Sequence, residues 1–249
     1  MNLSTSETID LMLNHRSIRK FDPEYVIPRE SIDLIVKAGQ KASTSGSLQM
    51  FTLIEISKSK RQEEETICGT QQFIKDASYF GILFADFYRL KRMLELSGGS
   101  YKNYPALSLT MGPLDAGLMI QNMALAAESL GYGMVFCGAC GDYGQRIFPE
   151  LEVPREVIPL TGIAIGKPLE RSESKPRLPT KLIHHCDKYF NYSDEDLKAG
   201  LDFMSKELSR INNREVSWGD TLVKRFNGGW AENRDKKRRN YLIEQNFKF

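Results

Sequence analysis

The sequence predicts a single domain, residues 1–249, that mixes α-helices with β-strands and ends in a helical arm from about residue 190. Apolar residues recur at helical spacing in some segments and alternate, as in strands, in others. A hydrophobic share of 41% and a charged share of 27% suit an ordinary core and a soluble surface. The sequence holds no internal repeat and no low-complexity stretch, which favours one domain over several.

Composition also narrows the possible partners. A net charge of +2 is too small to favour nucleic acid as the main partner, and the basic run Lys236–Arg239 is most simply a solvated helix face. Residues 1–10 lack the features of a signal peptide, and no apolar run approaches the roughly 20 residues that span a bilayer. Four cysteines do not make a disulfide framework in a chain of this size. We therefore expect a cytoplasmic protein without nucleic-acid or membrane partners.

Three of the predicted helices contain apolar faces. A capping box of Ser4 and Glu7 predicts a helix over 6–14. A second helix opens at Pro28, since proline is favoured in a first helical turn. The most apolar helix, 113–130, begins at a Gly-Pro pair and is apolar nearly all round, which predicts burial on several sides and a place at a dimer interface.

Four apolar runs are predicted as strands, at residues 51–56, 80–87, 134–137 and 157–165. The first alternates and is rich in β-branched and aromatic residues. The polar stretch 57–67 is predicted as a helix with solvated charge.

The segment His15-Arg16-Ser17-Ile18-Arg19 concentrates hydrogen-bond donors. On a helix end, Arg16 and Arg19 would lie on one face, because they are three residues apart. Guanidinium groups grip phosphate bidentately, so the segment is a candidate anion clamp for a phosphorylated ligand. The alternative is a solvated helix end whose cations interact with the helix dipole.

Other polar segments could contact the same ligand. Lys175 and Arg177 stand in a proline-stiffened segment and are a second candidate phosphate contact. The small-residue loop 42–47, followed by Gln49, is either a flexible connector or a hydroxyl-lined loop against a polar ligand. Gln71 could offer both a donor and an acceptor to a ring system.

Several common chemistries are excluded by the sequence. Cys137 and Cys140 form a C-x-x-C pair, but zinc would need a second pair, and Cys68 and Cys186 stand alone. Redox-active thiols at the C-x-x-C pair stay an open alternative. Sequence motifs of Rossmann, P-loop, serine-hydrolase and zinc-protease sites are absent from the sequence. Two cationic candidate phosphate contacts, with no acid–base pair beside them, suit a tightly bound organic cofactor that performs the chemistry itself.

Taken together, these stretches resemble the oxygen-insensitive nitroreductase family, in particular its nitroreductase A and NADPH–flavin oxidoreductase branch. The matching stretches, in the order of the family, are His15–Arg19, Ser43–Gln49, Gly69–Gln71, Gln121-Asn122 with Ala126–Gly131, Cys137–Ala139 and Lys175–Pro179. The arm is also similar around Asn212–Arg214 and Trp218. Each motif alone is weak evidence for this resemblance, whereas six motifs in the order of the family are specific evidence for it.

The resemblance implies an α+β fold with a central, mostly antiparallel sheet flanked by helices, in an intertwined homodimer that binds FMN at its interface. The residues that it assigns to FMN are His15, Arg16, Ser17, Arg19, Ser43, Ser45, Gln49, Gln71, Cys137, Gly138, Ala139, Lys175 and Arg177. The three from the hydroxyl loop (Ser43, Ser45 and Gln49) would come from the other subunit. The backbone N–H of Gly138 or Ala139 would face flavin N5. The family has two glycines after an aliphatic residue there, so Cys137 would lie near the ring without a thiol role.

The resemblance further implies a ping-pong reaction in which NADPH or NADH reduces FMN, and a nitroaromatic, quinone or free flavin reoxidises it. Arg210 and Arg214 are the candidates for the 2′-phosphate of NADPH, and no metal is implied. One alternative is a dedicated NADPH:FMN flavin reductase that supplies reduced flavin. A non-enzymatic alternative is a basic RNA- or nucleotide-binding module.

Overall fold

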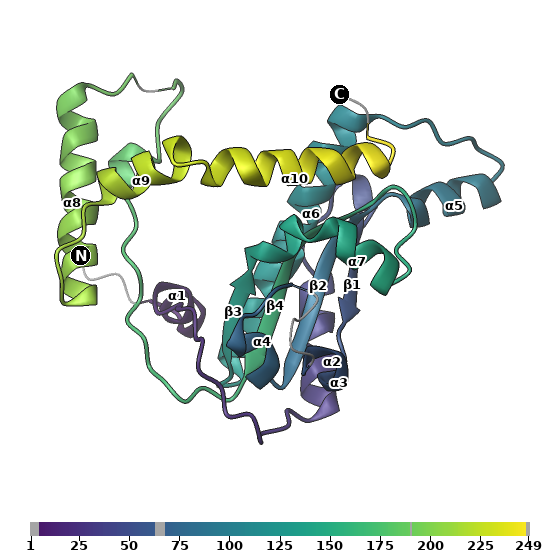
Figure 1. Ribbon diagram of the computed structural model, residues 1–249, viewed down its shortest axis with the longest axis horizontal. Helices are drawn as coiled ribbons and strands as arrows, with labels where there is room; N and C mark the ends of the chain where they lie inside the picture. Colours follow the sequence, from purple (N-terminus) through teal and green to yellow (C-terminus); the bar gives the residue numbers. More distant parts are fainter. Residues whose placement is uncertain (1–4, 63–67, 190, 248–249) are drawn as a thin grey trace. The chain divides into compact units, whose positions relative to one another are not determined.

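The computed structural model describes residues 5–62, 68–189 and 191–247 (Figure 1). The chain divides into two compact units, Met1–Ser172 with Lys237–Phe249, and Glu173–Lys236. The single-domain organisation over residues 1–249 stays a prediction.

A four-stranded sheet forms the centre of the first unit, with β1 (Phe51–Glu55), β2 (Tyr79–Asp86), β3 (Gly133–Cys137) and β4 (Val157–Gly166). The strand order is β1-β2-β4-β3, and every neighbouring pair is antiparallel. β1 and β3 are therefore the opposite edges of the sheet. All four predicted strands exist within one or two residues of their predicted bounds.

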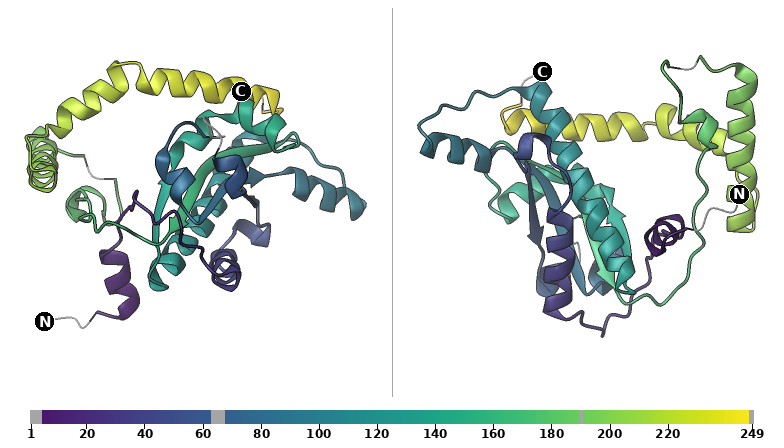
Figure 2. Two further views of the ribbon diagram at one scale, coloured as in Figure 1. Left: turned by 60° about the horizontal axis from the view of Figure 1, so that its bottom comes forward. Right: turned by 180° about the vertical axis from the view of Figure 1, so that it is seen from behind.

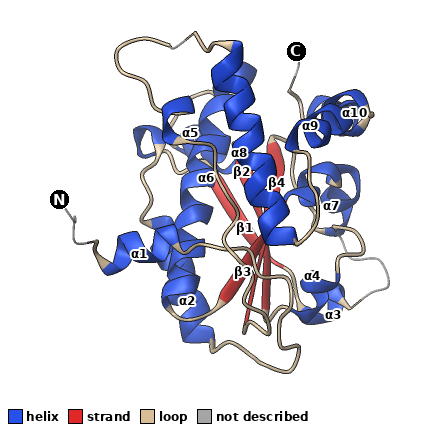
Figure 3. Cartoon of the chain, turned by 90° about the vertical axis from the view of Figure 1, so that its left-hand side faces the viewer, coloured by secondary structure: helices blue, strands red, loops and turns tan. Residues whose placement is uncertain are grey.

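Helices cover both faces of this sheet (Figure 3). On one face, α2 (Arg29–Gln40) and α6 (Pro105–Ser129) pack side by side against β2 and β4, as Figure 2 also shows. On the other face lie α4 (Gln72–Asp76) and α7 (Gly144–Glu150). Every residue of β2 is buried, because its alternating side chains enter one core or the other.

The long helix α6 differs from its prediction in two ways. It begins at Pro105, eight residues before Pro113, which lies inside the helix at the cost of one backbone hydrogen bond. Close packing compensates for this cost. Gly112 lies so near the Phe87 ring that a Cβ atom at this position would be only 2.5 Å from it. The helix is also not buried on all sides of a single chain, because Leu114 remains 58% exposed.

The N-terminal helix α1 (Glu7–Leu13) is capped by Ser6, whose hydroxyl accepts from the Ile9 N–H, rather than by Ser4. Ser4 and the 63–67 part of the predicted 57–67 helix lie outside the described residues. Of that helix, the structure shows α3 (Lys58–Arg61). The remaining short elements of this unit are α5 (Tyr88–Leu96), which was not predicted, and the 3-10 turns η1 (Ser45–Ser47) and η2 (Gly138–Asp142).

The second unit is helical, as predicted for the arm. It contains η3 (Thr180–Leu182), α8 (Asp194–Asn212), α9 (Trp218–Asn227) and the start of α10 (Trp230–Glu244). Serine hydroxyls cap α8 and α9. Within the described ranges, no helix has the length and apolar character needed to cross a membrane.

Candidate functional site

The segment His15–Arg19 runs along the β3 edge of the sheet as extended backbone. The Ile18 N–H donates to the Met134 carbonyl at 2.9 Å, and Ser17 forms a parallel bridge with Met134. Ile18 is buried against Gly133, where a Cβ atom would lie 2.9 Å from the Ile18 Cβ. A glycine in the edge strand thus allows the segment to dock closely.

The extended conformation places Arg16 and Arg19 on opposite sides of the segment. α1 ends at Leu13, so the segment is not a helix end, and residues three apart face opposite sides of an extended chain. Arg16 lines one cavity and Arg19 lines another. The prediction that both lie on one face is therefore wrong.

The cavity on the Arg19 side has a volume of about 750 Å³. Its polar lining consists of Ser17, Arg19, Lys20, Gln72, Asp76, Glu170 and Ser172. The Arg19 N–H donates to Glu170 at 2.8 Å, and the Ser172 hydroxyl donates to the Ser17 carbonyl at 3.0 Å. These two bonds fix the backbone of the segment and leave the Arg19 side chain exposed.

The cavity on the Arg16 side measures about 440 Å³ and also contains Arg171 and Glu128. The Arg16 Nε donates to the Asn14 carbonyl at 2.9 Å. Next to it, the His15 Nδ1 lies 2.9 Å from a carboxylate oxygen of Glu128, which projects from α6. Glu128 therefore holds the imidazole in place, a role that no sequence pattern indicated.

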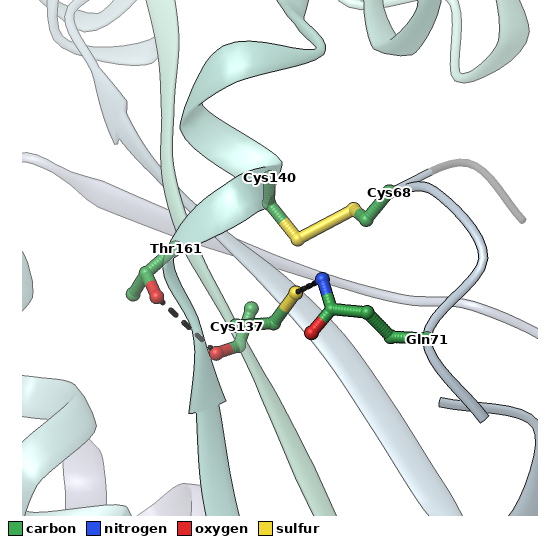
Figure 4. Close-up of a disulfide and its surroundings, with 6 residues drawn as sticks. Cys68, Gln71, Cys137, Cys140 and Thr161 are labelled. Carbon is green, nitrogen blue, oxygen red and sulfur yellow. Dashed lines mark hydrogen bonds between the residues drawn. A yellow bond between two sulfur atoms is a disulfide. The ribbon is translucent and has the colours of Figure 1, made fainter. Parts of the chain in front are cut away.

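Gln71 and Cys137 meet next to this edge, as Figure 4 shows. Gln71 caps α4 and donates from its amide to the Cys137 Sγ at 3.4 Å. Cys137 ends β3 and is followed by Gly138 and Ala139 in η2. Burial raises the pKa of the Cys137 thiol, and hydrogen bonds to its sulfur oppose that rise.

The cysteine pairing differs from the expectation. Cys140 forms a disulfide with Cys68, 72 residues earlier, while Cys137 and Cys186 are free (Figure 4). The C-x-x-C residues are therefore not each other's partner, and Cys68 does not stand alone. The sequence gives no signal for this pair, because only the packing of α4 and η2 on one face of the sheet brings them together.

The hydroxyl loop lies at the opposite edge of the sheet, where it leads into β1. Its Ser45 donates from both the backbone N–H and the hydroxyl to one oxygen of Asp115, at 2.8 Å each. Ser47 and Gln49 adopt positive φ angles of 59° and 52°, and Arg89 donates to the Gln49 carbonyl. Asp115 was missed, although an acidic residue among the apolar residues of this helix is an unusual feature.

Two strands, β2 and β4, separate this loop from the His15–Arg19 segment. At about 4.8 Å per strand, the two edges are on the order of 14 Å apart. One chain therefore does not bring Ser43, Ser45 and Gln49 together with the arginines. The expectation that the loop serves the other subunit's site stays a prediction.

The remaining predicted site residues belong to the second unit. Arg177 donates to the Lys175 carbonyl at 3.0 Å. Arg210 pairs with Glu207 and Glu173 at 3.1 Å each, and these partners raise the pKa of its guanidinium. Arg214 is exposed at the end of α8. The approach of these four cations to the cavities of the first unit stays a prediction.

Comparison with known proteins decides the family. Residues 12–167 match the model of the nitroreductase family. The chain belongs to the nitroreductase family. It is 33% identical over 229 residues to an FMN reductase (NADPH) of Bacillus subtilis, covering 88% of this chain and 90% of that protein. It is 34% identical over 227 residues to an oxygen-insensitive NADPH nitroreductase of Salmonella typhimurium, covering 88% and 92%.

The solved structure of the NfrA1 nitroreductase from B. subtilis is similar over 96% of this chain and 98% of that one, with a TM-score of 0.84 and 31% identity. This likeness confirms the predicted α+β fold and its antiparallel sheet. Among the described residues, no group of three or more His, Cys, Asp or Glu side chains could hold a metal ion.

Proposed function

We propose that this chain is an FMN-dependent NAD(P)H oxidoreductase that works by a ping-pong cycle, with nitroaromatics, quinones or free flavin as acceptors. The observation that carries the proposal is the β3 edge, where a cavity lined by Arg19 and Lys20, with Asp76 and Glu170 also in its lining, lies beside the amide donor of Gln71. Relatives named FMN reductase (NADPH) and oxygen-insensitive NADPH nitroreductase support the same activity.

The donors at this edge fit FMN. Arg19, with Lys20, suits the phosphate, and the Ser17 hydroxyl and the Glu170 carboxylate suit the hydroxyls of the ribityl chain. On the ring side, the Gln71 amide and the backbone of η2 offer polar contacts. Bound FMN supplies a ring that accepts a hydride from NAD(P)H and passes two electrons to an acceptor.

The protein's own part is placement and electrostatics. Arg19 and Lys20 on one side of the extended segment, and Arg16 and Arg171 on the other, would compensate negative charge on bound FMN. The fixed backbone of residues 17–19 sets where the cofactor can lie. Placement of the nicotinamide against the bound ring would turn a bimolecular step into an intramolecular one.

The active form that we propose is a homodimer. Leu107, Leu114 and Leu118 lie on one face of α6 and are 54%, 58% and 42% exposed. A contiguous exposed apolar face marks an interaction site. A second copy on this face would also supply the Ser43–Gln49 loop that one chain cannot bring to its own β3 edge.

Leu114→Glu combined with Leu118→Glu is expected to give monomers that retain little FMN, because buried charges would disfavour the dimer. Light scattering during gel filtration measures the mass, and absorbance at 450 nm measures the flavin. Val26→Glu, at a 75% exposed position before α2, is the control and should stay dimeric. A double variant that keeps the mass of two chains would refute the interface.

The proposed activity is tested on purified protein whose FMN content has been quantified. Yellow protein that oxidises NADPH or NADH with nitrofurazone or a quinone supports it. Much faster turnover with free FMN than with those acceptors would favour the dedicated flavin reductase, which the name of the B. subtilis relative suggests. Colourless protein without NAD(P)H oxidation would refute the proposal and favour the non-enzymatic binding module. A cytoplasmic location stays a prediction.

Arg210→Ala combined with Arg214→Ala is expected to raise KM for NADPH about 10- to 100-fold and to change KM for NADH less than about 2-fold, because charge-assisted bonds to a 2′-phosphate are lost. Steady-state kinetics with both nucleotides measure the split. The exposed Lys198→Ala on the same helix is the control. Equal effects on the two nucleotides would contradict the assignment.

A further inference from the structure

A disulfide joins two segments that the sheet packing brings together from distant parts of the sequence. Cys68 and Cys140 are 72 residues apart, and their Cα atoms lie 4.9 Å apart, within the usual range for a bridge. Both are buried, with exposed fractions of 1% and 0%. The bridge is thus an internal covalent link and not a surface contact.

The two bridged cysteines flank the ring-facing residues. Cys68 is three residues before Gln71, and Cys140 directly follows Gly138 and Ala139 (Figure 4). Between them, the Gln71 amide already reaches the Cys137 sulfur at 3.4 Å. Gly69 has a φ of +95° and packs against Tyr143, where a Cβ atom would lie 2.9 Å from the hydroxyl oxygen. The bridge therefore fixes the spacing of these two segments.

We propose that Cys68–Cys140 is a reversible redox site that sets FMN affinity: oxidised, it holds the Gln71 segment against η2, and reduced, it releases that segment. The inference rests on the proposed function, since it assigns the ring to these two segments. A covalent bridge removes open conformations that would otherwise have to be ordered again whenever the cofactor binds.

A dithiol is the co-reactant that balances the reduction step. A dithiol transfers two electrons and two protons to the Cys68–Cys140 bond, which gives two protein thiols and one cyclic disulfide of the reagent. Oxidised glutathione reverses the step by thiol–disulfide exchange and leaves two molecules of glutathione. The third nearby sulfur, Cys137, is a weak competitor in exchange, because its buried thiol resists ionisation.

The test compares the full-length holoenzyme after oxidised glutathione and after excess dithiothreitol removed under nitrogen. Iodoacetamide labelling followed by peptide mass measurement reports whether Cys68 and Cys140 are bridged. Dilution with detection of released flavin fluorescence gives Kd for FMN. We expect Kd to rise about tenfold on reduction, which corresponds to about 1.4 kcal/mol.

Two variants distinguish the effect of the bridge on Kd from the effects of other thiols. Cys68→Ser should behave like the reduced protein and not respond to dithiothreitol, whereas Cys186→Ser, at an exposed free cysteine, should respond like the wild type. If Cys68→Ser does not fold, the two states of the wild type still decide the question.

Equal Kd values in the two states would overturn the inference while leaving the proposed function intact. A bridge that never forms, or that resists dithiothreitol in the folded protein, would overturn it as well. Protein that holds no FMN in either state would instead defeat the proposed function on which the inference rests.

Discussion

Arg61→Met is expected to lower the free energy of unfolding by about 3–5 kcal/mol, the largest stability effect that we predict. Arg61 is 3% exposed, and burial lowers the pKa of its guanidinium because desolvation disfavours the charge. The side chain donates to four backbone carbonyls, those of Ile56, Ile74, Ala77 and Ser78, at 2.6–3.2 Å. Methionine fills similar space and leaves these carbonyls without that donor. Urea unfolding followed by circular dichroism measures the loss.

Arg29→Met is the matched control for this experiment. Arg29 pairs with Asp33 and Glu55 at 2.8 Å each, but its side chain is 65% exposed. Exposed ion pairs contribute little, so we expect a loss below about 1 kcal/mol. Similar losses in both variants would show that the Arg61 contacts do not fix α3 and α4 to the end of β1.

Arg19→Ala combined with Lys20→Ala is expected to weaken FMN binding by about 10³-fold, the largest functional effect. Each charge-assisted hydrogen bond to a phosphate contributes about 1.5–3 kcal/mol, and these two cations line the same cavity. Titration of apoprotein with FMN, followed by flavin fluorescence, measures Kd.

Arg92→Ala provides the control, since Arg92 is exposed on α5 and pairs only locally with Glu95. Its Kd should stay within about twofold of the wild type, because an exposed pair of this kind contributes little. Unchanged affinity in the double variant would restore the alternative in which the cations of this stretch are solvated and hold no ligand.

Local patterns were sufficient for most of the fold. The alternation in residues 51–56 and the apolar runs near 80–87, 134–137 and 157–165 correspond to the four strands, because a strand between two cores must be apolar on the faces that it buries. The helix from Pro28 was equally clear from this proline, which the structure places at the N-cap of α2. The mixed polarity of Tyr88–Leu96 hid α5, which is amphipathic but has no buried residue.

The candidate site was predicted in its residues but not in its geometry. Arg16 and Arg19 were placed on one face because a helix end was assumed, and docking of Ile18 against Gly133 instead makes the segment extended. Gly112-Pro113 looked like a helix start, yet close packing against Phe87 carries α6 through it. In both cases a glycine that permits close approach decided the outcome. The spacing of residues in the sequence does not show which side chain will pack against a glycine.

The sequence by itself determined the secondary structure of the sheet, the cationic segments and the family resemblance, because these depend on residue type and on neighbours a few positions away. Tertiary structure alone decided the pairing of Cys68 with Cys140, the contact of Asp115 with Ser45, and the two opposite edges that hold the hydroxyl loop and the arginines. These features join residues that are 70 or more positions apart or lie on non-adjacent strands. Only the strand order and the packing of helices on the sheet bring such residues together or hold them apart.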